Sequence, residues 1–110
     1  MIKNKTKNTT VSKDFKKLKS LYAKTKGLIG EKDIKTVVFQ TRFGIHTFGV
    51  KGPIDVLILS RKLKVVKLKK GLKPNLIFFW NPKYDIVIEL QKNSIEKSKT
   101  EIGDYLDFNL

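Results

Sequence analysis

The sequence predicts a mainly β protein, either a small β-sandwich or an open barrel, with one helix near the N-terminus. Three observations predict this fold class: short segments whose side chains alternate in polarity, turn residues about every ten positions, and a single long stretch with helical spacing. The chain has 110 residues, which is the size of one ordinary domain. We find no internal repeat, linker or low-complexity tract, so we expect a single domain, residues 1–110.

The N-terminal quarter of the chain combines a polar segment with the predicted helix. Residues 1–14 are polar and leave two alternatives, a flexible basic arm over residues 1–8 or a short edge strand near Thr9–Lys13. The next segment, Phe15–Gly27, ends on a glycine that suits a helix C-terminus. Its apolar side chains are spaced to form one helical stripe: Phe15, Leu18, Leu21 and Tyr22.

The centre of the chain predicts a β-hairpin. The segment Ile54–Leu59 is almost entirely apolar, so we expect a strand that is buried on both faces. Gly44–Val50 reads as the preceding strand, and Lys51-Gly52-Pro53 supplies a turn between the two.

Further strands are predicted on either side of this hairpin. In the segment Leu63–Lys69 the lysine alternation changes face near Val65-Val66, which predicts a β-bulge there. One or two helical turns are expected within Lys92–Lys99. The remaining predicted strands are Thr36–Gln40, Leu76–Trp80, Tyr84–Leu90 and Tyr105–Phe108.

The chain is strongly basic. It carries 24 lysine and arginine residues against 10 acidic residues, a formal net charge of +14. Such a surface attracts polyanions, so weak binding of nucleic acid or another polyanion is one interpretation, and a compositional background is the other. Only Arg42 and Arg61 are arginines. Because lysine binds phosphate as a point charge, the composition favours contacts with little sequence preference.

The composition also excludes several kinds of site and segment. The chain has no cysteine and one histidine, which excludes disulfides, thiolate zinc sites and multi-histidine metal sites within the chain. We expect no metal and no cofactor. No apolar run approaches the roughly 20 residues of a membrane-spanning helix. The polar start has no apolar stretch behind it, so we expect no signal peptide and a cytoplasmic protein.

One candidate pocket follows from polar residues placed in apolar surroundings. Asp55 lies in the buried strand, where a carboxylate must be paired or hydrogen-bonded. It is either a ligand-binding or acid–base group together with His46, or a structural carboxylate that accepts from the Lys51-Gly52-Pro53 turn or pairs with Arg42 or a lysine. Trp80 completes the candidate pocket, with membership of the core as its alternative.

A candidate anion-binding surface lies on the predicted strand that follows the hairpin. Its basic residues have no acid among them and stand close in sequence to the aromatic run Phe78-Phe79-Trp80. No motif of a known nucleic-acid module is present. The candidate anion-binding residues are Arg61, Lys67, Lys69 and Lys70.

A series of short segments along the chain, taken in order, forms a recognisable pattern: Thr25–Ile29, Val37–Phe39, Gly44–Phe48, Pro53–Leu59, Lys64–Val66, Phe78–Pro82, Val87–Leu90, Lys97–Thr100 and Ile102–Asp104. With these segments, the chain from about Lys3 to Phe108 resembles the uncharacterised domain-of-unknown-function family number 192, and in particular its archaeal members. The resemblance implies a compact domain similar to a jelly roll, with no established activity. Two positions depart from the family pattern, Gly49-Val50 and Ser60, so the resemblance does not extend to a pocket lined by the family's residues there.

Three functions are compatible with these observations. The leading hypothesis is a non-catalytic basic β domain that binds an anionic partner, either nucleic acid or an acidic protein surface. The alternative is a jelly-roll module for carbohydrate or another small ligand, which would use His46, Asp55 and Trp80. The third is an undescribed enzyme built on His46 and Asp55, although no candidate nucleophile stands at a recognisable spacing from them.

Overall fold

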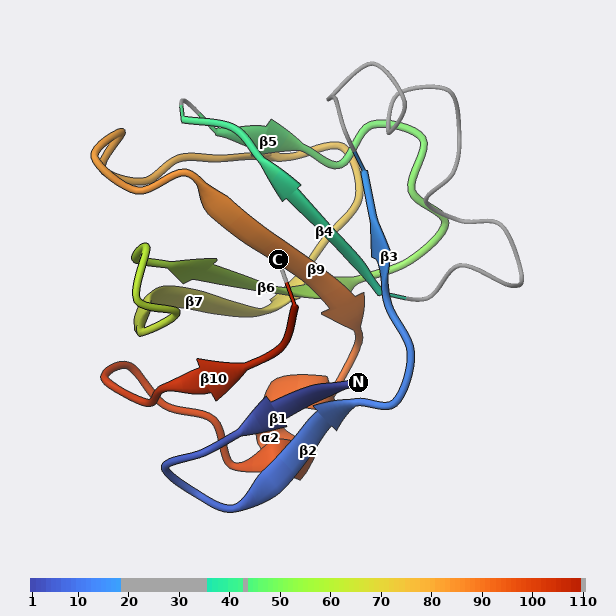
Figure 1. The fold of residues 1–110 in the computed structure, drawn as a ribbon. Helices are drawn as coiled ribbons and strands as arrows, with labels where there is room; N and C mark the ends of the chain where they lie inside the picture. Colours follow the sequence, from blue (N-terminus) through green and yellow to red (C-terminus); the bar gives the residue numbers. More distant parts are fainter. Residues whose placement is uncertain (19–35, 43, 110) are drawn as a thin grey trace.

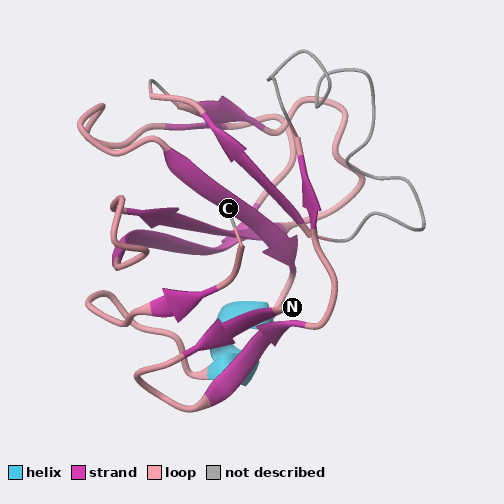
Figure 2. Cartoon of the chain, viewed as in Figure 1, coloured by secondary structure: helices cyan, strands magenta, loops and turns pink. Residues whose placement is uncertain are grey.

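The computed structural model describes residues 1–18, 36–42 and 44–109, and in these ranges the protein is mainly β (Figures 1 and 2). The strands form a five-stranded, a three-stranded and a two-stranded sheet. The one helix among the described residues is short, α2 (Ser94–Ser98), within the predicted segment Lys92–Lys99. The described strands do not close into a barrel.

The five-stranded sheet forms the middle of the molecule, with the order β3-β4-β9-β6-β7. All neighbouring pairs are antiparallel except β3 and β4, which are parallel. Its two central strands pair over six residues, and β6 is fully buried from Val56 to Leu59, as its apolar sequence predicts. The bounds are β3 (Lys16–Lys17), β4 (Val37–Gln40), β6 (Ile54–Leu59), β7 (Val65–Leu72) and β9 (Ile86–Gln91).

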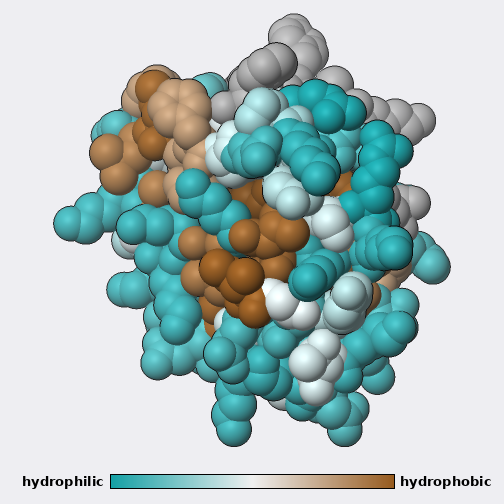
Figure 3. Space-filling model, turned by 90° about the vertical axis from the view of Figure 1, so that its left-hand side faces the viewer, coloured by the Kyte–Doolittle hydropathy of each residue, from teal (hydrophilic) through white to brown (hydrophobic). Residues whose placement is uncertain are grey.

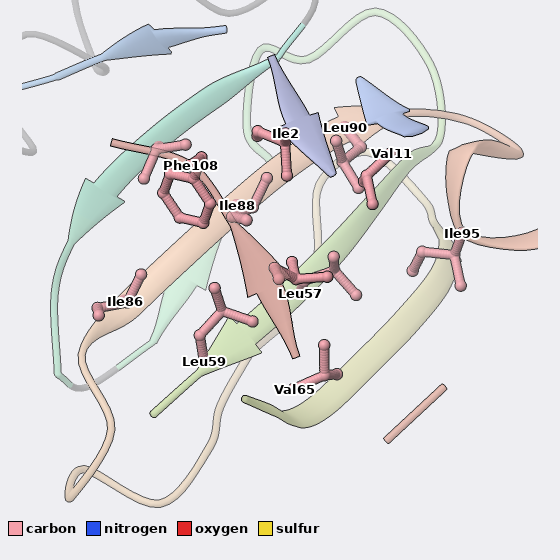
Figure 4. Close-up of a cluster of buried hydrophobic side chains, with 12 residues drawn as sticks. Ile2, Val11, Leu57, Leu59, Val65, Ile86, Ile88, Leu90, Ile95 and Phe108 are labelled. Atoms are coloured by element: carbon pink, nitrogen blue, oxygen red, sulfur yellow. The ribbon is translucent and has the colours of Figure 1, made fainter. Parts of the chain in front are cut away.

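Alternation along these strands produces a core on each face of the sheet. Leu57 and Leu59 point into one cluster, whereas Val56 and Ile58 point into the other. The first cluster is covered by α2 and by the sheet β10-β1-β2, whose strands are β1 (Ile2–Asn4), β2 (Thr9–Ser12) and β10 (Leu106–Asp107) (Figures 1 and 4). The second is covered by the sheet of β5 (Ile45–His46) and β8 (Ile77–Phe78).

The predicted hairpin between Gly44–Val50 and Ile54–Leu59 is wrong. Strand β5 pairs with β8, and β6 pairs instead with β7 and β9. The chain turns directly after β5, where the Val50 N–H donates to the Thr47 carbonyl. Thr47 also donates its N–H to Leu76 O at 2.9 Å and its Oγ1 hydroxyl to Lys73 O at 2.7 Å, which directs this segment toward β8.

Of the two alternatives for the N-terminal segment, the edge strand near Thr9–Lys13 is confirmed, because β2 (Thr9–Ser12) lies at the edge of its sheet. Ile2 is fully buried, and β1 is the middle strand of its sheet, so residues 1–8 are part of the fold rather than a flexible arm. The start of the predicted helix is wrong, because Lys16–Lys17 pairs in parallel with Val37 and Val38. A partner strand thus overrides the helical spacing there. The rest of the predicted helix lies outside the described residues.

The bulge predicted in the strand after β6 is confirmed. Ile58 pairs with Lys67 and Leu59 with Val65, so Val66 is the extra residue on β7. Its two neighbours along the strand consequently face opposite clusters: Val65 belongs to the cluster under β1, and the Lys67 ammonium lies over the Phe78 ring.

Candidate functional site

Asp55 is a buried carboxylate with two backbone partners. Its Oδ1 accepts from the Gly71 N–H and its Oδ2 from the Ile95 N–H, each at 2.9 Å, and the residue is 1% exposed. Gly71 has a φ of +63°, and the pairing of β6 with β7 is irregular beside it. Ile95 is the second residue of α2, whose N-cap residue Asn93 makes no side-chain capping bond. Asp55 therefore caps the helix from a neighbouring strand and accepts a hydrogen bond from the bulge at Gly71 within β7, using donors other than the predicted ones.

His46 is half-buried on β5 and lies against Phe48. The two rings stack with centroids 4.9 Å apart and planes inclined by 24°. The His46 Nδ1 accepts a hydrogen bond from the Phe48 N–H at 3.3 Å. This nitrogen therefore helps to fix the turn that follows β5.

Arg42 and Trp80 take positions apart from Asp55. The Arg42 guanidinium donates to Pro82 O at 3.2 Å and lies 3.7 Å from the Asp85 carboxylate. Trp80 is 7% exposed and donates its Nε1–H to Tyr84 O at 2.7 Å, within the core that β5 and β8 cover. In the structure these two predicted pocket residues therefore bond to partners other than Asp55. Trp80 belongs to the core.

A hollow of about 310 Å³ is present elsewhere on the molecule, between β2 and α2. It includes none of the four predicted pocket residues, and its lining has no aromatic side chain. Most of its lining is polar or charged, including Ser12, Lys13, Asp14, Gln91, Lys92 and Lys97.

The basic residues predicted to bind anions lie on an edge of the central sheet. Strand β7 is the last strand in the sheet order, and Lys67, Lys69 and Lys70 are all exposed. Lys67 pairs with Ile58 and Lys69 with Val56, so both lysines emerge on the face that β5 and β8 cover. The segment 60–75 contains no acidic residue, and all of its basic residues are exposed: Arg61, Lys62, Lys64, Lys67, Lys69, Lys70 and Lys73.

The lysine strand touches the aromatic run that follows it in the sequence. The Lys67 Nζ donates to Phe79 O at 2.7 Å and lies 4.9 Å from the centroid of the Phe78 ring. Lys64 stands 5.9 Å from the Tyr105 ring in the same way. Arg61 is 79% exposed at its side chain, with its guanidinium 3.9 Å from Asp85. The surface therefore combines exposed cations with aromatic rings.

Exposed apolar side chains gather around β5 and β8. Phe79 is 63% exposed, Phe48 and Ile77 are 54% exposed, and Leu76 is 45% exposed. In Figure 3 brown and tan side chains form a group at the upper left of one face, with teal hydrophilic side chains beside them. Trp80 is the aromatic residue of the predicted pocket, but the ring that faces solvent is Phe79, its neighbour in the same aromatic run. Alternation places these two side chains on opposite faces, but it does not decide which of them is buried.

Neither a metal-binding cluster nor a membrane-spanning helix is found among the described residues. Within residues 1–18, 36–42 and 44–109, no three histidine or acidic side chains gather into a group that could hold a metal ion. Over the same ranges, no helix has the length and apolar character required to cross a membrane.

The fold is similar to two solved structures. One is a protein of unknown function from Novosphingobium aromaticivorans, with a TM-score of 0.70, 12% identity, and coverage of 84% of this chain and 72% of that one. The other, from Sinorhizobium meliloti, is described as a "putative transcription regulator", with a TM-score of 0.67, 14% identity, and coverage of 83% and 78%. At these identities the likeness shows the fold alone. Neither the protein-family models nor the curated proteins give a match to this chain.

Proposed function

We propose that this protein is a small, non-catalytic basic domain that binds nucleic acid through the edge strand β7. The observation that supports this best is the Lys67 ammonium beside Phe78 and the exposed Phe79, on an edge without acidic residues between positions 60 and 75. Phosphates would be neutralised by the lysines, with release of condensed counterions. The similarity to a "putative transcription regulator" agrees with this proposal but adds only the fold to it.

The proposed binding is weak and has little sequence preference. Lysine lacks the planar fork with which arginine reads base edges. The arginines Arg42 and Arg61 both lie near the Asp85 carboxylate, which offsets their charge. We therefore expect dissociation constants in the range of about 10⁻⁴ to 10⁻⁶ M at physiological salt, which is typical of non-specific binding.

A salt titration with a labelled mixed-sequence oligonucleotide tests the proposal. We expect the affinity to fall steeply with salt, and the triple variant Lys67→Gln, Lys69→Gln, Lys70→Gln to flatten the slope by about one unit per lost phosphate contact. The matched control is Lys13→Gln, Lys92→Gln, Lys97→Gln, which removes the same charge around the hollow beside α2. Equal effects of the two triple variants would show that only net charge matters. Absence of binding at about 50 mM salt would refute nucleic-acid binding and leave an acidic protein surface as the anionic partner.

We also propose the finer structural and cellular assignments that the sequence suggests. The arrangement of sheets on both faces of β6 and β9 supports a jelly-roll-like β-sandwich. The order of segments from Val37–Phe39 to Ile102–Asp104 supports membership of the domain-of-unknown-function family number 192, and the basic polar surface supports a cytoplasmic location. An alignment of homologues that keeps these segments in register tests the family membership, and fractionation of cells tests the location.

A further inference from the structure

The outer face of the β5–β8 sheet is apolar and aromatic. Ile45 and Phe78 are cross-strand partners that point into the core. The other partner pair, His46 and Ile77, therefore points away from that core, and Ile77 is 54% exposed. Two residues further along the chain, Phe79 continues the same outward row with 63% of its surface exposed.

The two exposed rings on this face are each supported from one side. Gly44 has a φ of +142°, and a Cβ added to it would lie 2.9 Å from Phe79 Cδ1, so the Phe79 ring rests on bare backbone. The Phe48 ring stacks on His46. Phe48 keeps 54% of its surface exposed. A supported ring with a free side is prepared to stack, because little side-chain freedom is lost on binding.

One lysine contacts the segment that carries Phe79, and two more exposed lysines lie on β7 or directly after it. The Lys67 ammonium donates a hydrogen bond to the Phe79 carbonyl. The exposed Lys73 lies directly after β7, and its backbone carbonyl accepts from the Thr47 hydroxyl. Lys69 emerges on the same face of the sheet as Lys67. Cations beside exposed rings match a ligand that alternates negative charges with planar apolar groups. Single-stranded nucleic acid has this chemistry, since its bases are free to stack on aromatic side chains while its phosphates meet lysines.

We propose that the outer face of β5 and β8 is a stacking surface for unpaired bases, and that the ligand of this protein is single-stranded nucleic acid. This inference rests on the proposed binding of nucleic acid by β7 and names the form of the ligand. Bases would stack on the free sides of Phe79 and Phe48, while Lys67, Lys69 and Lys73 contact the phosphates between them. A duplex hides the faces of its bases, so it would meet only the lysines.

The test compares a labelled oligothymidylate of about 15 nucleotides with its duplex with oligoadenylate, at low salt. A duplex has more phosphates per length, so a purely electrostatic surface would favour it. We expect the single strand to bind more tightly. Phe79→Leu keeps the apolar bulk and removes the π face, and we expect it to raise the single-strand Kd about five- to hundredfold while the duplex Kd stays unchanged. Phe79→Trp should restore or strengthen binding.

The matched control is Ile102→Ala, which removes an equally exposed apolar side chain from another loop and should change neither Kd. Because Phe79 is exposed, all three variants should keep the thermal midpoint of the wild type. Salt-dependent binding of both forms with no effect of Phe79→Leu would overturn the stacking surface and leave the proposed function standing. If the wild type binds neither the single strand nor the duplex, both the stacking surface and the proposed function are overturned. Binding to vesicles of anionic phospholipid, without binding to either oligonucleotide, would instead show a membrane-surface domain.

Discussion

The Asp55 carboxylate reaches across 40 residues of sequence to accept the Ile95 N–H at 2.9 Å. This bond joins the central strand β6 to the first turn of α2, and the second oxygen of the same carboxylate accepts from the N–H of Gly71 at the bulge in β7. Asp55 is thus a structural carboxylate that links three elements.

Substitution of Asp55 is expected to destabilise the fold. Asp55→Ala leaves two backbone donors without their acceptor and should lower the free energy of unfolding by about 1–3 kcal/mol. Asp55→Asn has one acceptor oxygen instead of two and should fall between the wild type and Asp55→Ala. Urea unfolding followed by circular dichroism measures both, with Asp107→Ala, exposed on β10, as the control. An unchanged midpoint for Asp55→Ala would contradict the structural role.

Asp104 should make stability depend on acidic pH. Burial alone would raise its pKa, but the hydrogen bonds from the Asn4 amide, the Lys7 ammonium and the Glu101 N–H together hold the pKa below its ordinary value of 3.8. A carboxyl with a lowered pKa stabilises the fold above its unfolded pKa and loses that contribution as the pH falls through the folded pKa.

The expected result is a pH-dependent difference between the wild type and Asp104→Asn. The wild type should be more stable than Asp104→Asn by a constant amount above about pH 5, and this difference should shrink as the pH falls through the unfolded pKa toward the folded pKa. Urea midpoints at a series of pH values measure it, with Asp107→Asn as a control that should give no such trend. If the difference in stability between the wild type and Asp104→Asn keeps its neutral-pH value below about pH 3, the lowered pKa of Asp104 is contradicted.

Gly44 should be sensitive to a single methyl group. A Cβ at this position would lie 2.8 Å from Phe78 O and 2.9 Å from Phe79 Cδ1, on a backbone with φ of +142°. We expect Gly44→Ala to cost more than about 1 kcal/mol and to displace the Phe79 ring. Gly52→Ala is the matched control, because nothing lies within 4 Å of its added methyl group. Equal thermal midpoints for the two variants would show that the close approach at Gly44 is not needed.

Asp85 should restrain the anion-binding surface. It is a largely buried carboxylate within 3.7 Å of Arg42 and 3.9 Å of Arg61. Asp85→Asn frees both guanidinium groups, so the oligonucleotide should bind more tightly at low salt, with a slope steeper by about one unit for each new phosphate contact. Glu96→Gln removes an equal charge from the exposed side of α2 and serves as the control. Weaker binding by Asp85→Asn would place the ligand away from this edge.

Residues of the central sheet show how much was predictable from local pattern. The apolar run of β6 predicts a strand buried on both faces, and the lysine alternation of β7 predicts the bulge that the structure places at Val66. Both features can be read from residues that are neighbours in the sequence. Side chains alternate between the two faces of a regular strand, and a change in that alternation marks a bulge. The exposed lysines of β7 follow from the same pattern.

The sequence by itself therefore determined the mainly β class, the buried run Ile54–Leu59, the bulge and the basic character of strand β7. Only the tertiary structure decided that β5 pairs with β8, that Asp55 accepts from Gly71 and Ile95, and that Phe79 rather than Trp80 faces the solvent beside Lys67. The physical reason is that alternation sets which side chains share a face, whereas the choice of neighbouring strand is made by contacts between residues far apart in the chain.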